Sequence, residues 1–168
     1  MEAQQVFARL EQQFPGRVHD FKGDVAEPYF SADAASIVDV CRFLRDTEGL
    51  NFEVLSDLTA LDWPKEEKIQ VVYHLYSYVH KHQAVLKVDL PRGNPKLSTV
   101  EGVWKVANWF EREIYDLFGV IFDGHSDLRR IMLPDDWVGY PLRKDYVEQE
   151  EYDGMSTQRA ALVEKLLR

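Results

Sequence analysis

The chain has 168 residues, enough for one domain with its own hydrophobic core, and its 45% hydrophobic and 29% charged residues are typical of soluble globular proteins. Its 29 acidic residues outnumber 20 basic ones, and the net charge of -9 argues against nucleic-acid binding and against adsorption to an anionic membrane. The one cysteine, Cys41, excludes a cysteine-ligated iron–sulfur cluster or zinc site and an internal disulfide, and a buried thiol in a reducing, cytoplasmic compartment is expected.

The N-terminal segment MEAQQVFARLEQQF has acidic and amide residues where a secretory signal needs basic residues and an unbroken apolar run. No stretch approaches the ~20 apolar residues of a membrane-spanning helix. We therefore expect any membrane association to depend on another protein of the same assembly.

Apolar spacing in the first part of the chain predicts two helices around a short strand. The first helix covers residues 2–14, and a strand is expected around residues 29–30. Ser31 or Asp33 is expected to cap the second helix, and Gly49 to end it. The apolar side of this second helix consists of Ile37, Val40, Cys41 and Leu44.

The middle of the chain predicts a β-hairpin. Residues 52–55 suggest one strand, and residues 69–79 (IQVVYHLYSYV) are rich in β-branched and aromatic types. Residues 84–90 (AVLKVDL) alternate between apolar and polar, so the two segments are expected to pair through a turn at residues 80–83.

A third helix is predicted to begin near Ser98 or Thr99 and to run to Leu117. Gly119 stands just past the last periodic residue, where a left-handed conformation commonly ends a helix. Residues 120–122 suggest one more strand. Together, these elements predict a two-layer α+β fold with a mixed or antiparallel sheet and helices mainly on one face, formed by residues 1–122.

Residues 123–168 form the second predicted region, which we call the C-terminal strip. Only turn signals occur between residues 123 and 153, yet this stretch contains Trp and Tyr in numbers that a disordered segment lacks. A last short helix is expected from Ser156 to Leu167. The strip is therefore predicted to be an ordered, extended interface segment.

The acidic residues of the third helix offer only weak support for chemistry. Glu111 and Glu113 are two residues apart and point to different faces, whereas Glu113 and Asp116 could share a proton or a metal. Arg112 and Asp116 are four apart, and an ion pair between them on a solvated helix surface is favoured.

No other catalytic arrangement is evident from the residues. His80 and His82 are expected to be solvated turn residues, His74 to be a sheet residue, and His125 has no Ser or Cys partner nearby. The glycines do not fall into a phosphate-binding spacing. A stand-alone hydrolase that uses Glu113, Asp116 and His125 is kept as an alternative from a different functional class.

The strip combines basic pairs with aromatic residues. Arg129-Arg130 and Arg143-Lys144 lie close to Asp127 and Asp145, respectively, and alternate with Trp137, Tyr140, Leu142 and Tyr146. Arg and aromatic side chains beside prolines are typical of the centre of a binding interface. The alternative is that these residues form ordinary surface ion pairs, each of which stabilises the fold by under ~1 kcal/mol.

The same residues resemble the signature of the 30 kDa subunit family of respiratory complex I, whose bacterial form is the C-type subunit of NADH-quinone oxidoreductase. The resemblance covers Glu111-Arg112-Glu113, Asp116-Leu117-Phe118, His125, Arg129 and Ile131-Met132, and continues through LPDDWVGYPLRKDY, residues 133–146. Two departures are visible. Ser126 stands where the family suggests Pro, and Tyr140 where it suggests His.

The resemblance implies a peripheral-arm subunit of proton-translocating NADH:quinone oxidoreductase that holds no cofactor and no catalytic residue. NADH, FMN, iron–sulfur clusters and quinone would bind to partner subunits. The expected partners are the quinone-site large subunit and the subunit with the terminal [4Fe–4S] cluster, at the cytoplasmic face of the bacterial inner membrane. The alternative is an equivalent subunit of a related complex, either a membrane-bound hydrogenase or a ferredoxin-linked dehydrogenase.

The strip and its preceding helix are thus predicted to dock on partner subunits. The residues expected at this interface are Glu111, Arg112, Glu113, Asp116, His125, Asp127, Arg129, Arg130, Asp136, Trp137, Pro141, Leu142, Arg143, Lys144, Asp145 and Tyr146.

Overall fold

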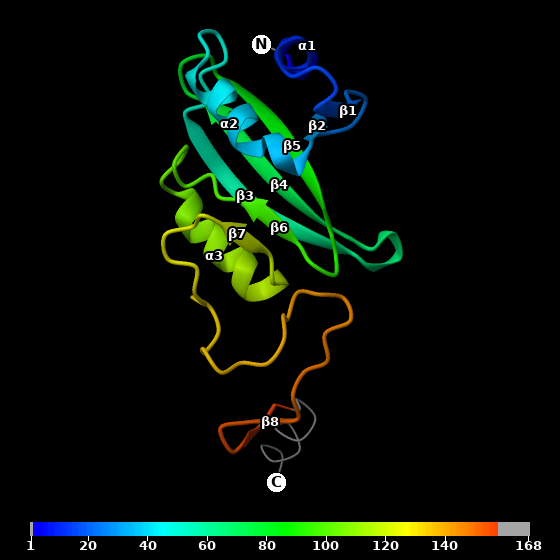
Figure 1. Ribbon diagram of the computed structural model, residues 1–168, viewed down its shortest axis with the longest axis vertical. Helices are drawn as coiled ribbons and strands as arrows, with labels where there is room; N and C mark the ends of the chain where they lie inside the picture. The colour runs from blue at the N-terminus through cyan, green and yellow to red at the C-terminus, as the bar shows by residue number, and fades with distance from the viewer. Residues whose placement is uncertain (1, 158–168) are drawn as a thin grey trace.

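A computed structural model describes residues 2–157 and confirms the α+β fold class (Figure 1). A five-stranded mixed sheet has the strand order β1-β2-β5-β4-β3. In Figure 1, α2 and α3 lie in front of this sheet and α1 lies at its upper end. The strands are β1 (Val18–Lys22), β2 (Tyr29–Ala32), β3 (Val54–Trp63), β4 (Lys68–Ser77) and β5 (His82–Pro91).

The three long strands form the centre of the sheet. β4 pairs antiparallel with both β3 and β5, β2 joins β5 in parallel, and β1 pairs antiparallel with β2. Residues on one face of β4 are buried in the core, namely Ile69, Val71, Tyr73 and Leu75. Because side chains alternate along a strand, His74 and Tyr76 point to the opposite face. β1 was not predicted, since only Val18 of its five residues is buried.

The helices supply the second layer. α1 (Ala3–Gln13) contacts β2 through the rings of Phe7 and Phe30, whose centroids are 6.2 Å apart. α2 (Ile37–Asp46) follows a short 3-10 helix, η1 (Ala34–Ser36). The predicted caps are wrong, because Ser31 lies in β2 and the Asp33 side chain makes no capping hydrogen bond.

The third helix begins later than predicted. α3 spans Ala107–Phe118, while Lys96–Ser98 form β6, which pairs in parallel with β7 (Ile121–Asp123). The residues between β6 and α3 form turns in which the amides of Val103 and Trp104 donate to the Val100 carbonyl. Those three side chains are buried, so their apolar spacing reflects core packing rather than helix. Gly119, as predicted, ends α3 with φ 74°.

The hairpin turn is also displaced from its predicted position. β5 begins at His82, which leaves residues 78–81 in the turn. His82 is buried rather than solvated, and its Nε2 lies 2.7 Å from the Leu50 carbonyl oxygen. The 3-10 helix η2 (Pro64–Glu66) lies between β3 and β4.

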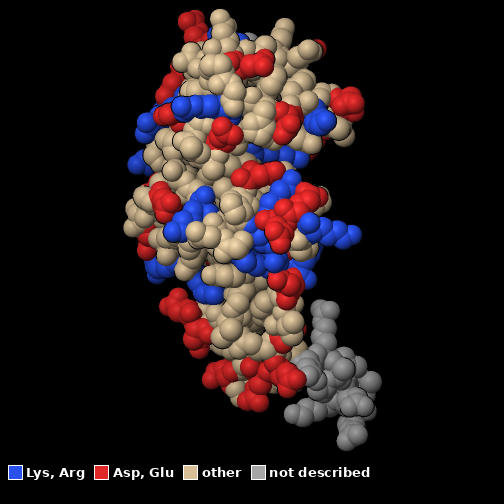
Figure 2. Space-filling view, turned by 45° about the vertical axis from the view of Figure 1, so that its right-hand side comes forward, with Lys and Arg blue, Asp and Glu red and all other residues tan. Residues whose placement is uncertain are grey.

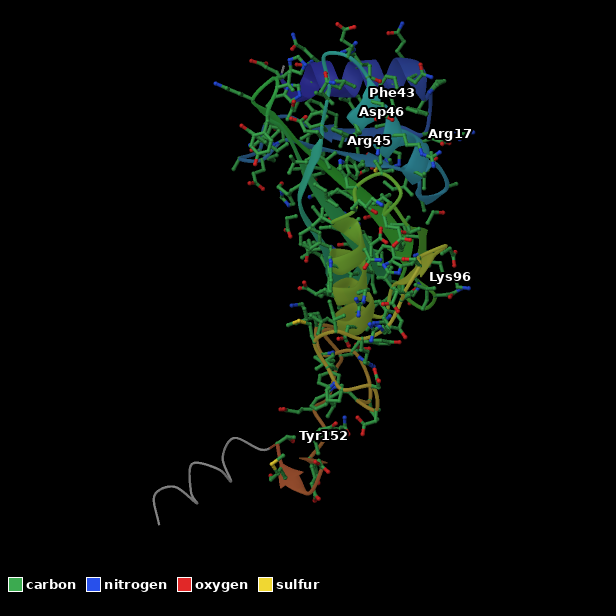
Figure 3. All side chains as sticks on the ribbon, turned by 90° about the vertical axis from the view of Figure 1, so that its left-hand side faces the viewer. Arg17, Phe43, Arg45, Asp46, Lys96 and Tyr152 are labelled. Atoms are coloured by element: carbon green, nitrogen blue, oxygen red, sulfur yellow. The ribbon has the colours of Figure 1, made fainter. Side chains whose placement is uncertain are left out.

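After β7 the strip leaves the sheet. It runs past the end of α3, and its described part ends in a small hairpin of β8 (Glu151–Tyr152) and β9 (Met155–Ser156), far from the sheet in Figure 1. Figure 3 shows the same separation, with Tyr152 at the opposite end of the molecule from Phe43 and Arg45 of α2. The predicted last helix lies outside the described residues except for Ser156 and Thr157. Within residues 2–157, no helix is long and apolar enough to span a membrane.

Candidate interaction site on the C-terminal strip

Glu111 holds the turn that precedes α3. Its carboxylate is fully buried and accepts hydrogen bonds from the Thr99 hydroxyl (2.5 Å) and the Val100 amide (2.7 Å). Burial raises the pKa of Glu111 from 4.5 to about 7, although these two donors act in the opposite direction. The residue predicted to lie at an interface is therefore part of the interior.

His125 anchors the first turn of the strip on α3. Its side chain is fully buried, and Nε2 lies 3.1 Å from the Asn108 carbonyl oxygen. Nδ1 accepts a hydrogen bond from the Asp127 amide (3.0 Å). The neighbouring Ser126 amide donates to Glu101 (2.9 Å), which gives the first family departure a role, because proline has no amide to donate.

Asp116 is the second anchor and is fully buried. One carboxylate oxygen accepts from the Arg130 guanidinium (2.6 Å). The other accepts from three successive backbone amides at 2.7–3.0 Å, those of Ile131, Met132 and Leu133. Burial raises the pKa of Asp116, but Arg130 and the three amides outweigh it, so the pKa is lowered overall.

The predicted Arg112–Asp116 ion pair on a solvated helix surface is therefore wrong. Arg112 is buried instead, and its Nη1 lies 3.8 Å from an Asp127 carboxylate oxygen. Its guanidinium also lies 5.0 Å from the ring centre of the exposed Trp109. The strip covers this face of α3. Charged residues that a solvated helix would expose to water are therefore buried here and contact the strip.

Tyr140 covers the C-terminal end of α3. Its ring lies so close to Gly119 that a Cβ atom there would approach ring carbons to 2.5 Å. The guanidinium carbons of Arg130 and Arg143 are 5.6 and 5.1 Å from the ring centre. Arg143 Nε also donates to the Phe118 carbonyl (2.7 Å), so the second family departure lies at a crowded contact.

Asp62 connects the strip to the sheet, and this contact was not predicted. Its carboxylate is buried, binds Arg92 through two hydrogen bonds (2.6 and 2.9 Å) and accepts from the Lys144 amide (2.7 Å). Arg92 also binds Asp145 (2.6 Å). The sequence did contain a signal, because Leu58, Ala60 and Asp62 alternate inward along β3 and an inward carboxylate needs a partner.

The aromatic residues of the strip contact one another. Trp137 Nε1 donates to the Tyr146 hydroxyl (3.1 Å), and the Trp137 and Tyr152 rings are 5.0 Å apart. The Tyr152 hydroxyl donates to Asp136 (2.9 Å). The Leu142 amide donates to the Leu117 carbonyl (3.1 Å), while the Leu142 side chain is exposed and Pro141 is half-buried. Up to residue 157, contacts among its own aromatic residues therefore add to those that the strip makes with α3 and β3.

The predicted hydrolase residues do not meet in one site. Glu113 is exposed, Asp116 is occupied by Arg130 and backbone amides, and His125 lies beside Asn108, near the other end of α3. Within residues 2–157, no group of three or more His, Cys, Asp or Glu side chains could hold a metal ion.

The outer surface of the strip is apolar in several places. Of the twelve exposed large hydrophobic side chains in the described chain, five follow residue 130: Met132, Val138, Leu142, Val147 and Met155. Figure 2 shows basic side chains gathered over the middle of the molecule and mainly acidic ones at its lower end. The described part of the strip therefore exposes several large apolar side chains, a feature that suits a protein interface.

Comparisons with known proteins point in one direction. The family model described as "Respiratory-chain NADH dehydrogenase, 30 Kd subunit" matches residues 30–152. A protein from Geobacter sulfurreducens, named as the C-type subunit of NADH-quinone oxidoreductase, is 41% identical over 87% of this chain and 93% of its own length. A protein of the same name from Geotalea uraniireducens is 45% identical over 82% of this chain and 84% of its own length.

Two solved structures resemble the fold. One is a chain of the membrane-bound sulfane sulfur reductase, an archaeal respiratory membrane complex, with a TM-score of 0.73 and 27% identity over 97% of this chain and 89% of that one. The other is a trypsin-resistant fragment of Nqo5, with a TM-score of 0.59 and 27% identity over 76% of this chain and all of the fragment.

Proposed function

The chain belongs to the family of 30 kDa subunits of the respiratory-chain NADH dehydrogenase, and on that premise we propose that it is a cofactor-free structural subunit of a proton-translocating NADH:quinone oxidoreductase. Its task is to dock on partner subunits through α3 and the C-terminal strip. NADH, FMN, iron–sulfur clusters and quinone bind elsewhere in the complex.

One observation carries this proposal. The strip is held by buried anchors, yet it exposes five large apolar side chains along the part that the structure describes. Exposed apolar groups on an ordered segment fit a permanent interface better than a solvated surface. Lys144 remains exposed beside them, and no hydrogen bond or ion pair among residues 2–157 engages its ammonium, so its charge is available to set the orientation of a partner.

The proposed partners are the quinone-site large subunit and the subunit with the terminal [4Fe–4S] cluster. The proposed location is the cytoplasmic face of the bacterial inner membrane, reached through these partners. A second candidate is the equivalent subunit of another membrane-bound respiratory complex, such as a hydrogenase or a ferredoxin-linked dehydrogenase. The structural similarity to a chain of the archaeal sulfane sulfur reductase complex supports this second candidate.

An affinity purification of the tagged chain from mildly solubilised membranes tests the proposal. We expect a quinone-site large subunit, iron–sulfur subunits and NADH:quinone activity to co-purify. A set of hydrogenase-type subunits would support the second candidate instead. A monomer without partners would contradict both.

A variant sharpens this test. Val147 is 84% exposed, so Val147→Asp should change the stability of the isolated chain by less than about 0.5 kcal/mol. A charge at a docking surface should nevertheless reduce the recovery of partners. Val79→Asp, at a 70% exposed position in the β4–β5 turn, is the control and should recover partners normally. Equal recovery by both variants would argue against docking by this part of the strip.

A further inference from the structure

An apolar cavity lies where the strip meets the sheet. Its volume is about 330 Å³, and residues of β3, the end of α3 and the strip line it. Leu61, Trp63 and Leu142 contribute side chains that are 42–48% exposed. Three segments that are far apart in the sequence thus line one cavity, and two of them bring exposed apolar side chains to it.

Hydrogen bonds hold the backbone of the strip at this cavity in the absence of a partner. The Lys144 amide donates to Asp62, and the Leu142 amide donates to the Leu117 carbonyl, so both strip residues are held by their backbone. Arg92 binds both Asp62 of β3 and Asp145 of the strip, and so links these two segments. A preformed pocket loses little conformational entropy on binding, which is a property of energetic centres in interfaces.

Two charged residues line the cavity, Asp62 and Lys144. The Asp62 carboxylate is neutralised by Arg92, to which it binds through two hydrogen bonds. Among residues 2–157, no hydrogen bond or ion pair engages the Lys144 ammonium, and the neighbouring Asp145 carboxylate also binds Arg92. The cavity is therefore complementary to an apolar group with a negative charge beside it.

We propose that this cavity receives an apolar side chain of a partner subunit, and that a carboxylate adjacent to that side chain in the partner binds Lys144. The inference rests on the proposed docking function and names the chemistry of the segment that docks. Leu61 and Trp63 belong to β3 rather than to the strip, so the docking surface extends onto the edge of the sheet.

A photocrosslinking experiment tests the occupant directly. The full-length tagged chain is made in its own host with p-benzoylphenylalanine in place of Leu61, irradiated in membranes, and analysed by mass spectrometry. We expect a crosslink to a co-purifying subunit, at an apolar residue next to Asp or Glu. A crosslink to this same chain, to a second copy, or to a segment without a carboxylate would overturn the inference.

Substitutions test the energetics with a matched control. Leu61→Asp and Lys144→Glu should each lower the recovery of partners on the order of tenfold. Val25→Asp, at a position with nearly the same exposure as Leu61 (43% and 42%), should not. Changing the crosslinked carboxylate of the partner to Lys should restore recovery with Lys144→Glu. Thermal unfolding of each isolated variant controls for folding.

The outcomes separate this inference from the proposed function. If the unmodified chain recovers its partners but Leu61→Asp recovers as much as Val25→Asp, the cavity is not the docking centre and the proposed function stands. If the unmodified chain recovers no partners, the proposed function fails and the inference fails with it.

Discussion

The buried carboxyl group of Glu111 illustrates how the interior of this protein affects the protonation of one titratable group. Four titratable groups lie near it: Glu101, His125, Cys41 and Tyr73. Burial raises the pKa of both the Cys41 thiol and the Tyr73 hydroxyl, so these two groups stay neutral. The carboxyl of Glu111 therefore has hydrogen-bond donors but no strong counter-charge, and it binds a proton near neutral pH.

This leads to a pH-dependent stability. The folded-state pKa of Glu111 (about 7) lies above its ordinary value of 4.5, so the folded state binds the proton more tightly. The resulting stabilisation is present at low pH and is lost as the pH rises through about 7, with an upper limit of about 3 kcal/mol. In urea unfolding between pH 5 and pH 8, the wild type should lose stability relative to Glu111→Gln as the pH increases.

The exposed Glu113 of the same helix provides the control, since Glu113→Gln should track the wild type across this range. A constant difference between wild type and Glu111→Gln from pH 5 to pH 8 would show that Glu111 does not titrate there.

Asp116 is the opposite case, a buried carboxylate that is fully compensated. Asp116→Asn leaves the Arg130 guanidinium without its counter-charge and weakens the acceptor for three amides. We expect a loss of about 2–4 kcal/mol in the free energy of unfolding. Hydrogen exchange should locate the effect, with faster exchange at the amides of residues 131–133. Unchanged exchange there would mean that other contacts hold the strip.

At the scale of elements, α3 serves two purposes through different faces. Ala107, Ile114 and Phe118 are buried in the core, while Glu111 binds the loop before the helix and Asp116 binds the strip after it. The helix thus combines an apolar side with a buried polar side. This is why apolar periodicity alone predicted that its charged residues face solvent.

The junction between α3 and the strip yields a prediction for Gly119→Ala. The positive φ of Gly119 disfavours any side chain, and an added Cβ would collide with the Tyr140 ring. We expect a loss of about 1–3 kcal/mol in stability, measured by thermal or chemical unfolding. Gly93→Ala, where an added Cβ meets nothing within 4 Å, should have almost no effect. Equal effects of the two variants would contradict the close packing of Tyr140.

At the scale of the whole molecule, the sequence predicted the helices and strands of the two layers but not the long-range contacts that join them. Apolar spacing predicted α1, α2, the central hairpin and the end of α3, because each depends on a local pattern. The contact between Asp62 and Lys144 joins residues 82 positions apart and uses a backbone amide, so no local pattern encodes it. The start of α3 was misplaced because buried turns can show the same apolar spacing as a helix.

The candidate site was predicted in part for the same reason. Composition drew attention to the strip through its charged and aromatic residues. It could not distinguish residues that close internal contacts, such as Asp116 and Arg130, from those that remain exposed, such as Lys144. Only the fold shows which partner each charge has, since burial is a property of the assembled chain.

The use of main-chain donors by Asp62 and Asp116 has an evolutionary consequence. The groups that fasten the strip at residues 131–133 and 144 are peptide amides, which every amino acid except proline provides. Substitution at those positions therefore leaves the fastening intact, whereas an insertion or deletion between them moves an amide out of reach. For these particular hydrogen bonds, the spacing of residues 131–133 and 144 therefore matters more than their side chains.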